Sequence, residues 1–448
     1  MTGQKRDQWS SNFGFIMAAT GSAIGLGNLW KFPYLAGRNG GALFLLLYLF
    51  FLILLGVPIL MSEMALGRST RKNAIDAYAA ISPKWRFAGM LGVLCAFLIL
   101  SYYSVVGGWV MKYISAFLTG GVGEDTAGYF DSFVSRPAEP ILWHFAFMVV
   151  CLVIVTGGIS KGIERVSKLL LPALLLFIVI LAVYGLTLDG AMEGVRFFLV
   201  PDFSAVHSVG DLGEIVLHAV GQVFFSLSLG MGTIITYGSY LGGDARLQKS
   251  AVAIPMLDTL VAVLAGFATL PAVFAFGFAP QGGPGLIFQT LPAVFQDMRF
   301  GVFFGLLFFL LVFFAAVTSG ISLLEVVASY LIDHFHWKRF YAALLPAALM
   351  FVLGTFASLS FGPLAGLRFG SMNLFDFLSH VSDRLLLPLG GFFLCIFVGY
   401  IWGTDRAYDE LSNHGALRFR MRRAYAAVLK YVAPAVILII FVASFFGI

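Results

Sequence analysis

The chain has 448 residues, of which 60% are hydrophobic and only 11% are charged. Soluble globular domains carry about 25% charged residues, so this composition excludes a soluble protein and indicates a membrane protein. The net charge of +5 arises in short polar segments without a basic patch interleaved with aromatic residues, so no nucleic-acid partner is expected.

Apolar segments long enough to cross a bilayer recur along the whole chain. They predict eleven membrane helices, at residues 11–36, 42–66, 87–118, 139–157, 166–188, 211–240, 247–277, 299–332, 338–357, 374–402 and 424–447. The predicted fold is therefore an all-α integral membrane protein that forms one domain over residues 1–448. Lys and Arg concentrate in alternate connecting segments, which predicts a cytoplasmic N-terminus and a C-terminus on the outer side.

The first predicted span contains an interruption. Residues 21–33 read GSAIGLGNLWKFP, with three glycines, an Asn, a Lys and a Pro inside an apolar segment. Lipid offers no partners for free backbone groups, so a broken membrane helix persists only where it lines a cavity inside the protein. The freed carbonyls and amides can hold ions or a carboxylate. This segment therefore predicts a binding site at membrane depth.

The sixth predicted span has a similar interruption, because small polar residues precede Gly230 and Gly232 at residues 222–233. Small residues in membrane helices also serve helix packing, and the two glycines alone do not decide between these readings. The interrupted spans are the first and the sixth, however, so they open consecutive groups of five helices. This placement predicts an inverted-repeat transporter with repeats at residues 11–188 and 211–402, followed by an additional helix at 424–447.

Neighbouring hydroxyls mark the eighth span, where Thr318 and Ser319 follow small residues. A single Ser or Thr in a membrane helix usually bonds back to a carbonyl one turn earlier. Two adjacent hydroxyls opposite a broken helix offer the hard oxygen ligands that a dehydrated sodium ion needs. The three cysteines, Cys95, Cys151 and Cys395, fall inside predicted spans, and no disulfide is expected.

These motifs resemble the neurotransmitter:sodium symporter family, in particular its bacterial amino-acid transporters with eleven helices. The resemblance covers the whole chain, and its most specific pieces are residues 21–33, 39–41, 62–68, 102–103, 221–240 and 314–319. It implies a five-plus-five inverted-repeat fold with two sodium sites, one central amino-acid site and no organic cofactor.

The resemblance also implies the ligands of both ions. The first sodium site would use the Ala23 carbonyl, the Asn28 side chain, the Ser226 carbonyl and hydroxyl, and the Asp258 side chain, and the substrate carboxylate would complete it. The second site would use the carbonyls of Gly21, Ile24 and Ala315 and the hydroxyls of Thr318 and Ser319. Five or six oxygens, most of them neutral, suit a small monovalent cation.

By the same resemblance, the substrate carboxylate would meet the amides of Leu26 and Gly27 and the hydroxyl of Tyr103. The amino group would meet carbonyls near Ala23, Phe225 and Ser226, with the Ser228 hydroxyl as a further candidate. The side chain would face Ile99, Phe225, Met231, Ser319, Ser322 and Leu323. Gly25 stands where relatives that carry amines have an Asp, which favours a full α-amino acid. The adaptable Met231 predicts broad hydrophobic specificity that includes aromatic residues.

The gates of the family are matched in part. On the outer side Lys31 stands where relatives have an Arg, and Asp376 is its expected partner, giving a looser gate because Lys cannot form a bidentate pair. The inner gate is expected from Arg6, Trp9, Tyr240 and Asp333. Glu63 is expected to accept hydrogen bonds from unwound backbone. Glu325 fits either an ion pathway or packing, and packing is the favoured interpretation.

Asp258 departs from the pattern of many family members, which have a neutral residue there and bind chloride beside it. Tyr48, Gln222 and Ser226 occupy the other chloride-site positions, but here the site carries its own negative charge. A carboxylate inside a membrane is costly unless it is paired or functional. We therefore expect transport that is independent of chloride, with Asp258 supplying the charge and taking up a proton after sodium leaves.

The predicted function is sodium-coupled import of hydrophobic L-amino acids by alternating access across a bacterial inner membrane, by a monomer or weak dimer. Two alternatives stay open: a proton-coupled or sodium-independent transporter of the same fold, and a non-transporting amino-acid sensor or channel. The Thr318 and Ser319 hydroxyls argue against the first, and loops of about twenty residues leave no room for a signalling domain. No nucleophile–base pair is evident, so an enzyme is not expected.

Overall fold

The computed structural model describes residues 7–203, 206, 208–277, 285–419 and 421–446. In these residues every regular element is helical, and the β-structure amounts to one isolated bridge between Phe369 and Met372. The first half of the chain forms α1 (Asn12–Ala23), η1 (Gly27–Lys31), α2 (Phe32–Arg38), α3 (Ala42–Phe51), η2 (Leu52–Gly56), α4 (Val57–Thr70), α5 (Ala74–Ile81), η3 (Pro83–Trp85), α6 (Arg86–Leu118), α7 (Thr126–Ser135), α8 (Glu139–Thr156), η4 (Ile159–Glu164), α9 (Arg165–Leu186) and α10 (Ala191–Leu199).

The second half forms α11 (Val209–Ser226), α12 (Thr233–Gly238), α13 (Leu247–Ala275), η5 (Leu286–Thr290), α14 (Leu291–Asp297), α15 (Gly301–Phe335), α16 (Arg339–Leu359), α17 (Leu374–His380), η6 (Val381–Leu386), α18 (Leu387–Ile396), η7 (Phe397–Gly403), α19 (Thr404–Leu411), α20 (Arg422–Ala427), η8 (Val428–Val432) and α21 (Ala433–Phe446). Most η elements are short stretches of wider helical turns that continue the neighbouring α-helices without a break in direction.

Within the described residues, nine continuous helices are long and apolar enough to cross a membrane. A tenth span is the pair of α1 and η1–α2, which is bent by 52° at a break of a few residues. The interrupted pair of α11 and α12 lies at the place of the expected sixth span but is not among these ten candidates in the described residues, so the count of eleven spans stays a prediction. The fifth span begins earlier than expected, at Ile159, and the tenth extends to Leu411.

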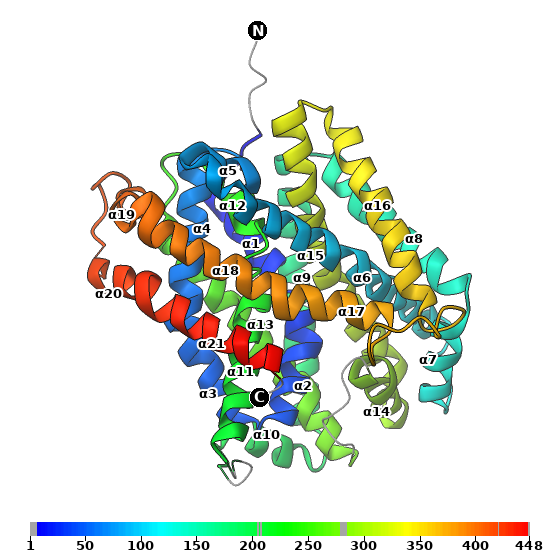
Figure 1. Ribbon diagram of the computed structural model, residues 1–448. Coiled ribbons are helices and arrows are strands. Elements are labelled where there is room, and N and C mark those ends of the chain that lie inside the picture. Colours follow the sequence, from blue (N-terminus) through cyan, green and yellow to red (C-terminus); the bar gives the residue numbers. More distant parts are fainter. Residues whose placement is uncertain (1–6, 204–205, 207, 278–284, 420, 447–448) are drawn as a thin grey trace.

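The two interrupted spans run in opposite directions. In Figure 1, α1 lies above α2, whereas α11 lies low in the molecule and α12 near its top. The chain therefore descends through the first interrupted span and ascends through the sixth, as an inverted repeat requires. The repeat boundaries at residues 11–188 and 211–402 stay predictions.

Backbone conformation shows why each helix stops in mid-span. At the first break, Ile24 leaves the helical region with a φ of −75° and a ψ of 95°. At the second break, Ser228, Gly230 and Gly232 all have positive φ values, of 54°, 78° and 77°. A side chain at Gly230 would also place its Cβ only 2.5 Å from the carbonyl oxygen of Leu387. Glycine is therefore required there both by backbone conformation and by close packing.

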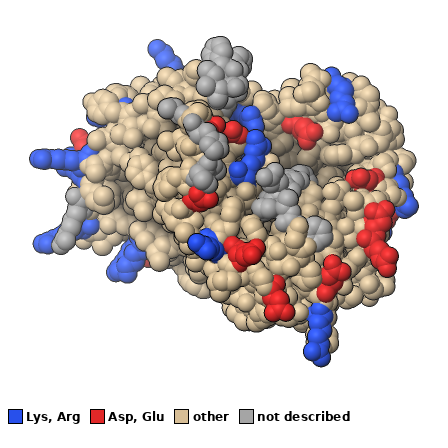
Figure 2. All heavy atoms as spheres, turned by 90° about the horizontal axis from the view of Figure 1, so that it is seen from below, with Lys and Arg blue, Asp and Glu red and all other residues tan. Residues whose placement is uncertain are grey.

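The interrupted helices lie in the centre of the bundle. α1 packs against α9, α13 and α15, while α6 crosses α15 and also contacts α8 and α16. Seen from below in Figure 2, large uncharged areas separate the charged side chains, and acidic and basic groups lie close together near the middle of this face. This is the end of the molecule toward which α2 and α10 lie in Figure 1.

Candidate substrate and ion sites

The candidate second sodium site joins α1 to α15. The Ser319 hydroxyl lies 3.4 Å from the Gly21 and Ile24 carbonyl oxygens and 3.1 Å from that of Ser22. One residue earlier, the Thr318 hydroxyl lies 3.1 Å from the Ala315 carbonyl oxygen. A Cβ on Gly21 would meet Thr318 at 3.1 Å, so α1 and α15 approach closely. The five residues predicted for this site from the resemblance are thus brought together.

The candidate first sodium site is a buried cluster around the Asp258 carboxylate on α13. Asn28 donates from its amide nitrogen to Asp258 Oδ1 at 2.8 Å, and Ser226 donates from its hydroxyl to Asp258 Oδ2 at 2.7 Å. All three side chains are buried. Ala23, the fourth predicted ligand, is the last residue of α1 and lines the central cavity described below. The cluster therefore joins the Asp258 carboxylate to the Ser226 hydroxyl and the Asn28 amide, whose oxygen accepts a hydrogen bond of 3.3 Å from the Gly25 amide.

Two of the three residues assigned to the chloride region also contact this carboxylate. The Tyr48 hydroxyl donates to Asp258 Oδ2 at 3.2 Å, and Ser226 shares that oxygen. Gln222 instead donates to the Gly27 carbonyl at 3.0 Å. The carboxylate of Asp258 thus lies among the hydroxyls that would otherwise face an anion.

A cavity of about 20 Å³ lies beside the second candidate sodium site, because Ser319 also lines it. Nine of the twelve residues predicted for the substrate line it, namely Ala23, Ile99, Tyr103, Phe225, Ser228, Met231, Ser319, Ser322 and Leu323. Leu26 and Gly27 line the neighbouring outer cavity instead, and Ser226 belongs to the Asp258 cluster. Ser22 and Gly25 also line the central cavity, and the sequence reading gave neither of them as a contact.

Hydrogen-bond donors for a carboxylate meet at one end of this cavity. The Leu26 amide donates to the Tyr103 hydroxyl at 3.2 Å, so two predicted carboxylate partners already point toward one another. A Cβ on Gly25 would lie 2.7 Å from the Ser319 hydroxyl and 3.0 Å from the Tyr103 hydroxyl. A side chain at Gly25 would therefore fill this end of the cavity, and glycine keeps it open.

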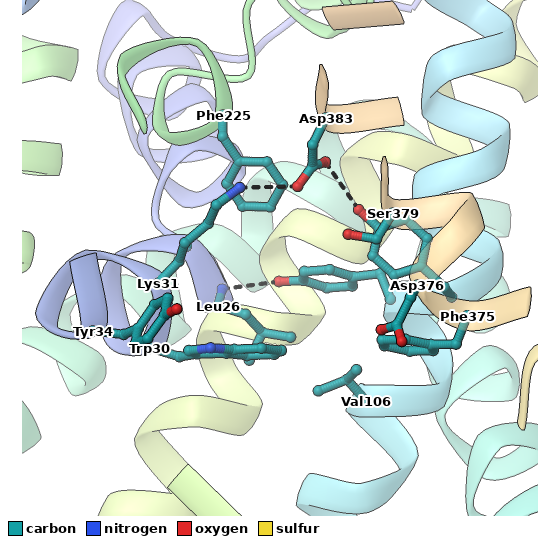
Figure 3. A pocket seen from close by; sticks show the side chains of 13 residues that line it. Leu26, Trp30, Lys31, Tyr34, Val106, Phe225, Phe375, Asp376, Ser379 and Asp383 are labelled. Atoms are coloured by element: carbon teal, nitrogen blue, oxygen red, sulfur yellow. Dashed lines mark hydrogen bonds and ion pairs between the residues drawn. The ribbon is translucent and has the colours of Figure 1, made fainter. Parts of the chain in front are cut away.

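A larger cavity of about 220 Å³ lies on the side that the sequence predicts to be the outer one (Figure 3). Tyr103 and Phe225 line both cavities, so their rings separate the central site from the outer one. In Figure 3, Lys31 extends over Phe225 toward Asp383. Its ammonium lies 4.2 Å from the ring centre of Phe225 and 2.9 Å from the Asp383 carboxylate.

The prediction that Lys31 pairs with Asp376 is therefore wrong. Asp376 lines the same cavity but the ion pair is made with Asp383, which lies seven residues further along the tenth span. Asp383 also accepts a hydrogen bond of 3.2 Å from the Tyr102 hydroxyl. Two partners on different helices thus fix this carboxylate, and we call the pair of Lys31 and Asp383 the outer gate.

The opposite side of the central site is closed by contacts around Trp9. Its indole N–H donates to the Tyr237 carbonyl at 2.8 Å, and its amide donates to the Tyr240 carbonyl at 3.3 Å. Asp333 accepts a hydrogen bond of 3.0 Å from the Asn73 amide. Arg6, the remaining residue of the predicted inner gate, lies outside the described residues.

Glu325 belongs to this closed side, although the sequence reading interpreted it as a packing residue. Tyr240 donates from its hydroxyl to Glu325 Oε1 at 2.7 Å, and the Arg339 guanidinium lies 2.5 Å from Oε2. Arg339 also lies 3.4 Å from Asp7. Side chains from α16 and from the turn after α12 therefore meet at this buried carboxylate, and the N-terminal segment is linked to it through Arg339; we call Trp9, Tyr240, Glu325 and Arg339 the inner gate.

The interpretation of Glu63 agrees with the geometry. Its carboxylate Oε1 accepts a hydrogen bond of 2.8 Å from the Gly230 amide, inside the break between α11 and α12. A free amide in mid-membrane needs such a partner, because lipid supplies none. Glu63 thus stabilises the interrupted helix from α4.

Two helices broken opposite each other, with oxygen clusters beside a closed cavity, define a secondary transporter of small solutes. A model of the sodium:neurotransmitter symporter family matches residues 6–126 and 136–448, and the chain belongs to this family. The sodium-dependent transporter YhdH of Bacillus subtilis is 39% identical over 98% of both chains. The sodium-dependent serotonin transporter of Drosophila melanogaster is 25% identical over 100% of this chain and 78% of its own.

Among solved structures, that of MhsT in complex with L-phenylalanine is similar, with a TM-score of 0.90 and 42% sequence identity. The match covers 98% of this chain and 100% of that one. These similarities confirm the predicted fold class and the prediction of a sodium-dependent membrane transporter rather than an enzyme.

Proposed function

We propose that the protein imports hydrophobic L-amino acids, aliphatic and aromatic, together with sodium and without a need for chloride. The observation that carries this proposal is Ser319, which lines the central cavity and also contacts the Gly21 and Ile24 carbonyls of the second sodium site. One side chain would thus adjoin both a sodium ion and the substrate. The structure of MhsT in complex with L-phenylalanine supports a hydrophobic amino acid as the substrate.

Two sodium ions take part in the proposed mechanism. One would bind around Asn28, Ser226 and Asp258, and the other around Thr318, Ser319 and the carbonyls of α1. Each ion neutralises freed backbone carbonyls and holds the broken helices in one conformation. The substrate carboxylate would complete the first site, so that sodium and substrate increase each other's affinity.

Alternating access would then use the two gates in turn. The substrate reaches the cavity when the outer gate of Lys31 and Asp383 is open and the Phe225 and Tyr103 rings are apart. Closure of these rings precedes opening of the inner gate and movement of the inner part of α1. With the N-terminus in the cytoplasm of a bacterial cell, the membrane potential contributes about 2.3 kcal/mol per charge for every 100 mV.

Chloride independence follows from the charge of Asp258. Its carboxylate is buried beside the Tyr48 and Ser226 hydroxyls, so the site carries the negative charge that balances the sodium ion. An additional anion in the same place would be repelled at short range. Asp258 would take up a proton for the return of the empty carrier.

Uptake into liposomes tests the proposal. Purified protein is reconstituted, and uptake of radiolabelled tryptophan and leucine is measured with sodium or potassium outside, and with chloride or gluconate as the anion. We expect uptake only with sodium, at equal rates in both anions, and competition by other hydrophobic amino acids but not by glutamate or lysine. Uptake without sodium contradicts the ion sites, and equal competition by charged amino acids contradicts the substrate class. Protein-free liposomes are the control.

A further inference from the structure

The segment between the tenth and eleventh spans carries an excess of positive charge. Residues 404–431 contain three acidic residues and six basic ones, namely Asp405, Asp409 and Glu410, and Arg406, Arg418, Arg420, Arg422, Arg423 and Lys430. Of those that the structure describes, none lines the central cavity or belongs to an ion site or a gate. The proposed transport mechanism therefore leaves this charge without a role.

The acidic residues of the segment already have partners. Asp405 lies 2.7 Å from Arg422, and Glu410 pairs with the buried Arg68 of α4. Asp409 lies 2.7 Å from a histidine ring in the loop that follows α19. The remaining basic side chains therefore find no free carboxylate within the segment.

Four basic side chains stay unpaired in the part of the segment that the structure describes. Arg406, Arg418 and Arg423 are exposed, and none of them has a hydrogen bond or an ion pair with a described residue. Lys430 is half-buried and also has no ion pair there, and its ammonium lies 6.0 Å from the ring centre of Tyr400. These charges are available to a ligand from outside the chain.

Contacts between the two spans bring three of these cations into one region of the surface. Tyr400 donates from its hydroxyl to the Lys430 carbonyl at 2.8 Å, so the spans touch at this level. The ion pair of Asp405 joins them again nearer the connecting loop, and its two members are the chain neighbours of Arg406 and Arg423. In Figure 1, α19 and α20, which carry these two arginines, lie next to one another at the left.

This region lies at the level of the lipid headgroups. The candidate span Arg422–Ala443 has 22 residues, and about twenty cross the hydrocarbon layer, so Arg423 stands at the membrane surface. Tyr400 and Tyr431 are 53% and 66% exposed, and tyrosines on the outside of membrane proteins gather at the headgroup level. Unpaired cations next to exposed rings at the edge of the hydrocarbon match a phosphate group and the upper part of its acyl chains.

Side chains of α4 hold this region in place. The Ser62 hydroxyl lies 2.8 Å from the Tyr425 hydroxyl of α20, and both residues are buried. Arg68 bonds to the Glu410 carboxylate of α19 and, at 3.0 Å, to the Asn413 side chain. The cations therefore lie on a fixed scaffold, which lowers the entropic cost of binding a ligand.

We propose that Arg406, Arg423 and Lys430, with the rings of Tyr400 and Tyr431, form a binding surface for the phosphate of an anionic phospholipid. We call these five residues the basic surface. Arginine binds phosphate oxygens through two parallel hydrogen bonds, and each basic residue near an anionic lipid surface raises affinity about fivefold. A zwitterionic lipid brings its own ammonium group close to the phosphate, which weakens the attraction. The inference does not depend on which solute the protein carries.

Lipid titration of the purified full-length protein tests the proposal. The protein in detergent is titrated with phosphatidylglycerol or phosphatidylcholine of the same acyl chains, and bound lipid is counted by native mass spectrometry. We expect at least about tenfold higher affinity for the first bound phosphatidylglycerol than for phosphatidylcholine. Equal affinities overturn the proposal. Equally tight binding of glycerol phosphate, which lacks acyl chains, also overturns it, because the site would then be one for a soluble anion.

Matched double variants assign the affinity to the basic surface. Arg406→Gln with Arg423→Gln removes two of its charges, and we expect phosphatidylglycerol affinity to fall about tenfold or more while phosphatidylcholine affinity stays the same. Lys84→Gln with Lys338→Gln is the control, because both are exposed basic side chains of other connecting segments and the change in net charge is equal. An equal loss in the two double variants shows a general effect of charge and overturns the proposal.

A variant with the opposite sign separates binding from damage to the fold. Asp405→Asn removes the partner of Arg422 and so adds an unpaired cation next to the basic surface. We expect phosphatidylglycerol affinity to rise several-fold in this variant, measured by the same titration. Loss of structure cannot produce a gain in one variant and a loss in the other. Unchanged or lower affinity in Asp405→Asn contradicts the proposal.

Discussion

The ammonium of Lys31 lies 2.9 Å from the carboxylate of Asp383, directly over the ring that covers the central cavity. The Phe225 ring lies between this ion pair and the substrate pocket, and it lines the cavities on both of its sides. Formation of the pair therefore holds the ring in its closed position. The charge pair and the hydrophobic lid act as one outer closure, joining the first span to the tenth.

Neutralising Asp383 is expected to weaken this closure. The side chains of Lys31 and Asp383 are 30% and 17% exposed, so solvent screens the pair in part and the effect is moderate. We predict that Asp383→Asn lowers uptake at limiting substrate about three- to tenfold, and that Lys31→Arg retains most activity. Asp376→Asn is the matched control, because Asp376 lines the same cavity without pairing with Lys31. Greater sensitivity to Asp376→Asn than to Asp383→Asn contradicts the assignment.

Neutralising Asp258 is expected to create a requirement for chloride. Its carboxylate accepts hydrogen bonds from Tyr48, Ser226 and Asn28, and these groups remain after Asp258→Asn or Asp258→Ser. They then surround a place with no negative charge, where a chloride ion can restore the balance. We predict low uptake in gluconate that rises several-fold with chloride, measured beside the unaltered protein. Full activity of the variant without chloride excludes this role for Asp258.

Removing the Thr318 hydroxyl is expected to weaken sodium binding at the second site. The hydroxyl also bonds to carbonyls of its own helix, and that bond alone would make it a structural group. We predict that Thr318→Ala raises the sodium concentration for half-maximal uptake about tenfold, and that Thr318→Ser restores it. Thr269→Ala is the control, since Thr269 is buried and bonds to the Ala265 carbonyl in the same way, outside the sodium sites. Equal sodium dependence of both variants contradicts the assignment.

The interrupted helices and the second oxygen cluster could be predicted from the sequence because their signals are local. Glycines and polar residues in a membrane span leave few structural choices, since lipid does not satisfy free backbone groups. Ser319 and Thr318 stand side by side in the chain, and their partner Gly21 lies in the most unusual segment. Composition and spacing were therefore sufficient for the interrupted helices and the hydroxyl pair, whereas the carbonyl partners were implied by the family resemblance.

The partner of Lys31 could not be chosen in this way. Asp376 and Asp383 lie seven residues apart, which is two helical turns, so both face the same side of the tenth span. Which of the two carboxylates pairs with Lys31 depends on how far along the tenth span the ammonium group lies. It also depends on Tyr102 of α6, whose hydroxyl donates a hydrogen bond to Asp383. These contacts arise only from tertiary packing.

Ser22 and the short helices between spans were missed for different reasons. A serine in a membrane helix usually bonds within its helix, so nothing in the sequence indicated that Ser22 meets Ser322 of α15. The helices α5, α7, α10 and α14 have only seven to ten residues, below the length at which apolar periodicity is informative. Their packing against the long spans supplies the stability that their sequences lack.

Glu325 gives the last prediction, because its role was hidden by partners that are distant in sequence. Its buried carboxylate contacts Tyr240, which follows α12, and Arg339 of the ninth span. The negative charge of Glu325 therefore holds these two elements together when the inner gate is closed. Removing one partner of a buried pair leaves the other uncompensated. We predict that Glu325→Gln favours opening of the inner gate and lowers uptake at least several-fold.

Hydrogen–deuterium exchange should then be faster in α1 and α12, with sodium reversing only part of the change. Asp405→Asn, which removes an exposed ion pair with Arg422, should leave exchange in these helices unaltered. Unchanged exchange in Glu325→Gln would show that this carboxylate serves packing alone.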